Sequence, residues 1–137
     1  MKRPVIMRAT AVIAVLFGIP LLLAPNALLA MYRAGELNVP GIYNSMLYGA
    51  CLIGLGVMNW LAAGASHAEA RPVIAGSTVV AVLGFLVAIS RQLMDQAPPM
   101  AWFNVVLFFV LAVSYVGLLR GAAAPDTASA AALERVQ

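Results

Sequence analysis

The sequence predicts an all-α integral membrane protein, a four-helix bundle with up-down-up-down topology. Three observations lead to this prediction: four long apolar stretches cover most of the 137 residues, 64% of the residues are hydrophobic, and only 9% are charged. Soluble domains contain about 45–50% apolar and about 25% charged residues. A soluble chain of this length could not bury four such stretches, so we expect them to cross a lipid bilayer as a multi-pass protein.

The four stretches have the length and composition of transmembrane helices. A helix needs about 20 apolar residues to cross the hydrocarbon layer, and no stretch has a charged residue or a histidine in its interior. We expect one four-helix domain over residues 1–120, with helices at residues 9–24, 46–63, 73–90 and 101–119. Residues 121–137 are rich in alanine and are expected to form a flexible cytoplasmic tail.

The basic residues predict an orientation. Six of the eight Lys and Arg residues lie before the first stretch, between the second and third, or after the fourth, whereas Arg33 and Arg91 lie in the other two loops. Because cytoplasmic loops carry an excess of Lys and Arg, both termini are expected in the cytoplasm. The start of the chain also has the features of a signal peptide, with a cleavage site after Ala30. We favour four retained spans, because Pro25 and Asn26 fit a helix stop followed by a turn.

Small residues repeat at helical spacing in the second and third stretches. Gly49 and Gly56 share one face of the second stretch, and Ser77 and Gly84 share one face of the third. Helices in lipid associate through close packing and hydrogen bonds, so these four candidate helix-packing residues are expected to face the bundle interior. The alternative is that Gly and Ala are simply common in membrane helices.

Polar residues gather near the expected outer ends of the helices and form a candidate outer-side polar cluster, which consists of Asn44, Tyr48, Arg91, Asp95 and Asn104. Arg91 and Asp95 have the spacing of a helical salt bridge. Charges that point into a membrane bundle tend to mark binding sites or pathways. The alternative is an exposed ion pair that contributes about 0–1 kcal/mol, with the asparagines as hydrogen-bonding contacts between helices.

Several kinds of chemistry lack the residues that they need. Cys51 is the only cysteine and His67 the only histidine. Thiol exchange needs paired cysteines, and a membrane haem or a multi-histidine metal site needs more ligands than one chain supplies. We therefore expect no cofactor, no metal site and no catalytic residue. The basic residues are spread over both termini and every loop, so no nucleic-acid partner is expected.

Short motifs carry a resemblance to a known group of proteins. They are Leu16–Gly18, Ala24–Leu29, Tyr48–Ala50, Gly54–Gly56, Asn59–Leu61 and Trp102. Together they resemble a broad group of small four-helix bacterial membrane proteins that form a domain family of unknown function (DUF4345-like). That pattern often has an arginine shortly before its Tyr-Gly pair, where this chain has Asn44 and Ser45. The resemblance implies a location in the bacterial inner membrane and no particular activity.

Three classes of function remain. We favour a non-enzymatic structural or accessory subunit that packs through Gly/Ala-rich helix faces, against itself as a homo-oligomer or against another membrane protein. One alternative is an oligomeric small-molecule transporter or channel subunit, without proton coupling through a buried acid because no acid lies inside a span. The other is a membrane-embedded enzyme or a lipid- or quinone-binding protein, whose ionisable groups would be interfacial ones such as His67 and Glu69.

Overall fold

A computed structural model describes residues 2–32, 35–94 and 99–123. Within these ranges the chain forms α-helices and one 3-10 turn, and no β-strand. In order, the elements are α1 (Arg3–Leu23), α2 (Pro25–Met31), α3 (Val39–Gly64), α4 (His67–Met94), the 3-10 turn η1 (Pro99–Ala101) and α5 (Trp102–Ala123). The helices α1, α3, α4 and α5 are long and apolar enough to cross a membrane. This confirms the all-α class that the sequence predicts, with four helices that could each cross a membrane.

Proline and asparagine set the boundaries of the first three helices. The residue before a proline avoids helical backbone angles, and proline itself fits the first turn of a helix. Accordingly, α1 ends before Ala24 and α2 begins at Pro25. Asn38 caps α3, because its Oδ1 accepts a hydrogen bond from the Gly41 backbone N–H at 2.9 Å.

A capping box begins α4 earlier than the apolar pattern suggests. The Ser66 N–H donates to Glu69 Oε2 at 2.9 Å, and the Glu69 N–H donates to Ser66 Oγ at 3.4 Å. The loop expected over residues 64–72 is therefore reduced to a turn at Ala65 and Ser66. His67, expected in a loop, is instead the first residue of α4.

The helices also extend beyond the other apolar stretches. They begin at Arg3 rather than at residue 9 and at Val39 rather than at residue 46, and α5 ends at Ala123 rather than at residue 119. Hydropathy finds only the part of a helix that suits hydrocarbon, whereas backbone hydrogen bonding continues until a cap or a proline intervenes. Of the expected tail, residues 124–137 lie outside the described residues.

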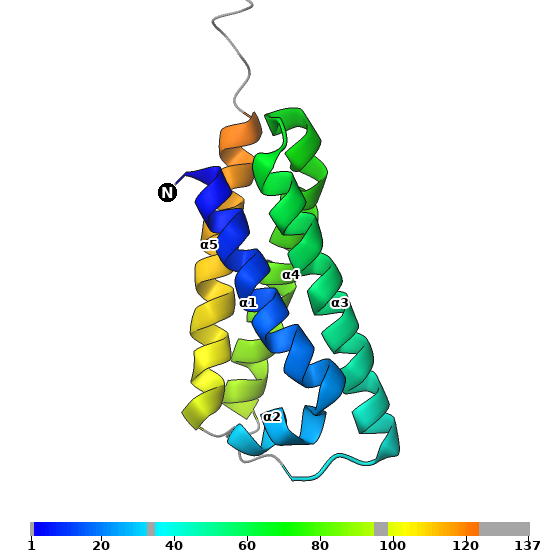
Figure 1. Cartoon of the computed structure of the whole chain (residues 1–137). Helices are drawn as coiled ribbons and strands as arrows, with labels where there is room; N and C mark the ends of the chain where they lie inside the picture. The colour runs from blue at the N-terminus through cyan, green and yellow to red at the C-terminus, as the bar shows by residue number, and fades with distance from the viewer. Residues whose placement is uncertain (1, 33–34, 95–98, 124–137) are drawn as a thin grey trace, which may run out of the picture.

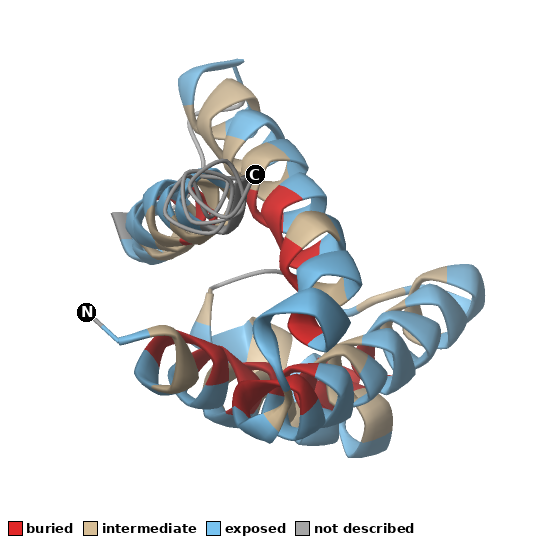
Figure 2. Ribbon diagram, turned by 90° about the horizontal axis from the view of Figure 1, so that it is seen from above, coloured by how far each residue is buried: buried red, intermediate tan, exposed pale blue. Residues whose placement is uncertain are grey.

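The four long helices are arranged as two closely packed pairs. Helix α1 packs along α3, and α4 packs along α5, whereas contacts between the two pairs are fewer. Figure 1 shows α1 crossing in front of the α4/α5 pair, and the end view in Figure 2 shows buried faces turned inward and exposed faces turned outward. The outward faces carry large apolar side chains, among them Leu16, Leu61 and Val87. Such faces suit contact with lipid.

Glycines allow the backbones of α1 and α3 to touch. A Cβ atom placed on Gly49 would lie 2.7 Å from the Gly18 carbonyl oxygen and 2.7 Å from the Leu22 nitrogen. A Cβ atom on Gly56 would lie 3.0 Å from the Ala11 carbonyl oxygen. Close approach of this kind gives helices in lipid the packing that holds them together. The α1/α3 pair is therefore fixed along much of its length.

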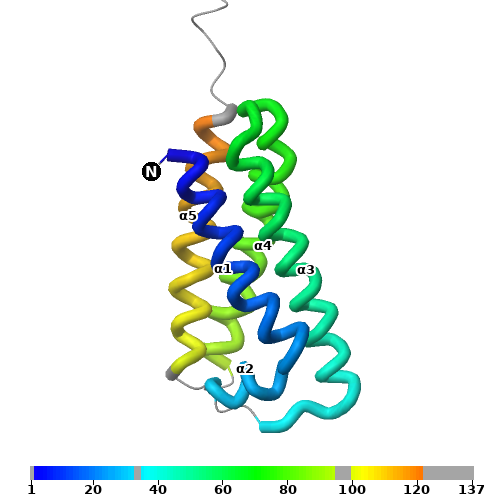
Figure 3. The backbone as a smooth tube through the Cα atoms, viewed as in Figure 1, coloured from blue at the N-terminus to red at the C-terminus, as the bar shows by residue number. Residues whose placement is uncertain are grey.

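The two ends of the molecule differ in how the pairs meet. The N-terminus, the α3–α4 turn and the end of α5 lie at one end, which we call the closed end, and α2 lies across the other, which we call the cleft end (Figures 1 and 3). At the closed end all four long helices contribute to one core, formed by Ile6, Met7, Ala62, Ala63, Ala70, Ile74 and Tyr115. The pairs are therefore joined by side-chain packing at the closed end.

Candidate functional site: a cleft between the helix pairs

A cavity of about 320 Å³, which we call the central cavity, lies between the two helix pairs. Side chains from all five α-helices line it, and most are apolar, such as Ile13, Leu52 and Leu111. Its described lining contains no Asp, Glu, Lys, Arg, His or Cys. Pockets for small molecules in proteins usually measure about 300–1,000 Å³ and are mostly apolar. The central cavity has the size and surface of such a pocket.

A second cavity, of about 630 Å³, adjoins the first towards the cleft end. We call it the mouth cavity. It lies between α3 and the α4/α5 pair, and its lining includes Arg91 near the end of α4. Four residues line both cavities, namely Tyr48, Val80, Asn104 and Phe108. The two cavities are therefore neighbours, and together we call them the cleft.

The Phe108 ring fits into the cleft because it lies against a glycine of α4, Gly84, which has no side chain to fill that space. A Cβ atom on Gly84 would lie 2.5 Å from the Phe108 ring. The ring therefore occupies the space that any larger residue at position 84 would fill. At the cleft end the rings of Phe17 and Phe103 stack with their centroids 6.1 Å apart and bring α1 to α5.

A buried polar cluster connects the helix pairs beside the central cavity, on the side of the closed end. Asn59 of α3 is fully buried, and its Nδ2 donates to Ser77 Oγ of α4 at 3.0 Å and to the Leu55 carbonyl at 3.0 Å. The Tyr115 hydroxyl of α5 donates to Asn59 Oδ1 at 2.5 Å. We call Asn59, Ser77 and Tyr115 the buried polar cluster. It is a hydrogen-bonded contact between the two pairs.

The hydrogen-bond donors near this cluster are all used within the protein. The Ser77 hydroxyl lies 3.4 Å from Asn59 Oδ1, to which it donates. The Thr10 hydroxyl donates to the Ile6 carbonyl at 3.0 Å and is also buried. A buried polar group that keeps its partner avoids the free-energy cost of an unmade hydrogen bond. This part of the central cavity therefore offers no described donor for the acceptor group of a ligand.

Donors at the cleft end are not used in the same way. The Tyr32 hydroxyl donates to Asn104 Oδ1 at 3.4 Å, and among the described residues neither the Asn104 amide nitrogen nor the Tyr48 hydroxyl donates a hydrogen bond. Burial raises the pKa of Tyr32, and the hydrogen bond to Asn104 opposes this shift. Tyr32 is therefore a neutral donor near pH 7.

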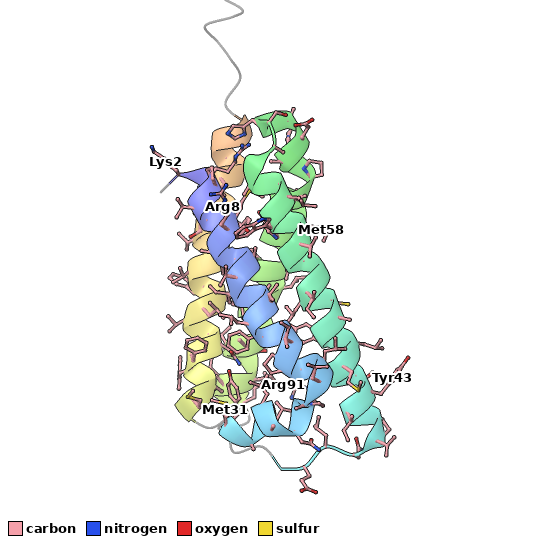
Figure 4. The ribbon with its side chains drawn as sticks, viewed as in Figure 1. Lys2, Arg8, Met31, Tyr43, Met58 and Arg91 are labelled. Carbon is pink, nitrogen blue, oxygen red and sulfur yellow. The ribbon has the colours of Figure 1, made fainter. Side chains whose placement is uncertain are left out.

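The structure brings together part of the polar cluster expected at the outer ends of the helices. Tyr48, Arg91 and Asn104 line the mouth cavity. Asn44 is exposed and does not line either cavity, and Asp95 lies outside the described residues. Figure 4 shows Arg91 near the α2 end of the molecule, far from Lys2 and Arg8.

The glycines expected to mediate helix packing are engaged inside the chain. Gly49 and Gly56 lie against α1, and Gly84 lies beneath Phe108. Ser77, named with them, belongs to the buried polar cluster. By contrast, Cβ atoms on Gly54 and Gly76 would meet nothing within 4 Å. The tight Gly contacts of this structure therefore hold its own helices together.

Sequence reasoning did not foresee the buried polar cluster as a unit. A signal was present, because an asparagine or tyrosine deep in an apolar stretch needs a partner on another helix. The choice of Tyr115 as the partner of Asn59 depends on how α3 and α5 are rotated, which helical spacing within one stretch does not reveal.

The only cysteine, Cys51, is exposed on α3. Among the described residues, no three His, Cys, Asp or Glu side chains come close enough to hold a metal ion.

Comparisons of the chain with protein-family models, with curated proteins and with solved structures find no match. The resemblance to the DUF4345-like group stays a prediction.

Proposed function

We propose that this protein is a non-enzymatic accessory membrane protein that holds a lipophilic molecule in the cleft between its two helix pairs. The observation that carries the proposal is the central cavity, with its volume of about 320 Å³ and its mostly apolar lining drawn from all five α-helices. Water is poorly held in an apolar cavity, whereas the chain of a lipid or another lipophile fills it favourably. The described lining of the central cavity contains hydroxyl groups but no Asp, Glu, Lys, Arg, His or Cys that could serve as a general base or a metal ligand for an enzyme.

The proposal includes an orientation in the bacterial inner membrane. The four long helices would cross it in alternation, as a bundle, with both termini in the cytoplasm. Lys2 and Arg8 lie at the closed end (Figure 4), together with the α3–α4 turn, and Arg8 Cζ lies 5.7 Å from the centroid of the Trp60 ring. An excess of basic residues at one end favours the cytoplasmic side. A fluorescent protein fused after residue 137 should fluoresce, and an active alkaline phosphatase at that position would contradict the orientation.

A pair of neighbouring valines tests the cleft. Both valines are exposed on α4, but Val80 lines both cavities, whereas Val79 lines neither. Val80→Trp should fill the junction of the cavities, and Val79→Trp adds the same bulk on an exposed face outside both cavities. The native protein and both variants would be purified in mild detergent, and the bound molecules would be identified by native mass spectrometry.

We expect a lipophile to remain on the native protein and on Val79→Trp, and to be reduced at least about tenfold on Val80→Trp, as expected for a pocket filled by a large side chain. Equal retention on both variants would place the lipophile on the outer surface and contradict the proposal. A stoichiometric protein partner found in the same spectra would identify the complex that this accessory protein serves.

A further inference from the structure

The two ends of the cleft differ in the hydrogen bonds that they offer to a ligand. Near the buried polar cluster, the Tyr115 hydroxyl and the Asn59 amide already donate to protein acceptors. A carboxylate, phosphate or carbonyl oxygen placed there would gain no described donor and would lose its hydration. The part of a ligand that lies beside the buried polar cluster is therefore apolar.

The mouth cavity, by contrast, has side-chain donors and a positive charge in its mostly apolar lining. Asn104 and Tyr48 line it, and each has a side-chain donor that makes no hydrogen bond among the described residues. Arg91, an exposed residue, lines the same cavity from α4 and supplies a positive charge. A guanidinium group together with amide and hydroxyl donors is a chemistry that recognises oxyanions, because its charge-assisted hydrogen bonds are stronger than neutral ones.

Arg91 also lies at a depth in the membrane that suits contact with a lipid headgroup. It lies in the last turn of α4, at the end of a long apolar helix. Lys and Arg near the ends of transmembrane helices extend towards the headgroup region, where anionic lipids attract them. A lipid phosphate at this level could reach Arg91 while an acyl chain of the same lipid enters the central cavity past Val80 and Phe108.

From this asymmetry we infer that the ligand of the cleft is an anionic phospholipid, with its phosphate at Tyr48, Arg91 and Asn104 and an acyl chain in the central cavity. The inference rests on the proposed function, since it requires the cleft to hold a lipophile. It adds the charge, the class and the direction of the bound molecule.

The test compares two lipids that have the same acyl chains but headgroups of different net charge. Delipidated protein in a neutral detergent is titrated with dioleoyl phosphatidylglycerol, which is anionic, or with dioleoyl phosphatidylcholine, which is zwitterionic, and the bound lipid is counted by native mass spectrometry. The native protein should prefer phosphatidylglycerol by about tenfold, as expected for one charge-assisted contact. Arg91→Gln should remove this preference. Arg71→Gln, which neutralises an exposed arginine in the first turns of the same helix, should keep it.

Asn104→Ala provides an independent variant on α5 and should weaken phosphatidylglycerol binding about threefold, as expected for one neutral hydrogen bond. If Arg91→Gln fails to elute as a folded protein, the result for Asn104→Ala decides whether the headgroup assignment is correct. Equal affinity of the native protein for the two lipids would overturn the headgroup assignment. An unchanged preference in the folded Arg91→Gln protein would overturn it as well.

Two further arms separate the possible failures. If Val80→Trp and Val79→Trp bind both lipids like the native protein, the proposed function itself fails, whereas loss of binding in Val80→Trp without headgroup preference overturns only the inference. Inorganic phosphate, at the concentration of the lipid, should not displace phosphatidylglycerol. Displacement would indicate a site for free phosphate and would contradict the assignment to a lipid.

Discussion

The closed end and the cleft end of this molecule are built from similar residues with opposite results. At the closed end, Asn59, Ser77 and Tyr115 bond to one another across the helix pairs. At the cleft end, Tyr48 and Asn104 line a space between the pairs, and the Tyr32 hydroxyl donates to Asn104 Oδ1 at the longer distance of 3.4 Å. Where polar side chains of the two helix pairs form hydrogen bonds with one another, they close the gap between the helix pairs. Where described side chains such as Tyr48 do not donate to a protein acceptor, they leave donors for another molecule.

The comparison also separates two ways of holding helices together in lipid. Within the α1/α3 pair, contact is made by backbone atoms at Gly18 and Gly49 and needs no polar group. Between the pairs, contact is made mainly by the core of the closed end and the buried polar cluster, with the stacked rings of Phe17 and Phe103 at the cleft end. Loss of the glycine contacts should separate α1 from α3. Loss of the contacts between the pairs should let the two pairs move apart while each pair stays intact.

The largest effect is expected for Gly49→Val. The new side chain would meet backbone atoms of Gly18 and Leu22 that cannot rotate away. We expect a loss of about 3 kcal/mol in the free energy of unfolding, at the upper end for overpacked sites. Unfolding in mixed micelles of sodium dodecyl sulfate, followed by circular dichroism, would measure it. Gly54→Val is the control on the same helix, where a Cβ atom meets nothing within 4 Å, and similar losses in both variants would refute the close-approach argument.

A smaller effect, confined to the contact between the pairs, is expected for Asn59→Leu. The substitution removes the acceptor of the Tyr115 hydroxyl and a donor to Ser77. A loss of about 2 kcal/mol follows from breaking these bonds and leaving a buried group unpaired. The same unfolding assay applies. Asn44→Leu changes an exposed asparagine of α3 and should alter the stability by less than about 0.5 kcal/mol, as surface substitutions usually do. If Asn59→Leu proved equally neutral, the cluster would not hold the pairs together.

The smallest effect is expected at the cleft end, for Tyr32→Phe. It removes only a long hydrogen bond of 3.4 Å to Asn104. We expect a change in unfolding free energy of less than about 0.5 kcal/mol, because a long, partly exposed bond contributes little. A loss as large as that of Asn59→Leu would mean that the cleft end is as firmly joined as the closed end.

Much of this architecture follows from the sequence, because the length, hydropathy and residue spacing of each helix are properties of one segment of the chain. Length and hydropathy predict the long helices, and Gly49 and Gly56, which share one face at helical spacing, lie against α1 in the structure. The start of α4 was missed because the capping box of Ser66 and Glu69 lies in a polar segment that reads as a loop.

The site was less predictable, since it depends on how the helices are rotated about their axes. Tyr48, Arg91 and Asn104 could be named from their level in the membrane, but the exposed Asn44 shows that level alone does not place a side chain in a cavity. The pairing of α1 with α3 and of α4 with α5, and the space between the pairs, arise from contacts far apart in the chain. No periodicity within one stretch contains that information.

Photolabelling tests the central claim most directly. A phosphatidylglycerol with a diazirine near the end of one acyl chain would be incorporated into membranes with the protein. The membranes would be irradiated, and the positions of the lipid adducts on the protein would be mapped by mass spectrometry of peptides. We predict adducts on cavity-lining residues of both pairs, such as Ile13 of α1 and Leu111 of α5, that disappear in Val80→Trp and persist in Val79→Trp. Adducts confined to outward-facing residues such as Val79 and Val113, unchanged by Val80→Trp, would contradict a lipid-filled cleft.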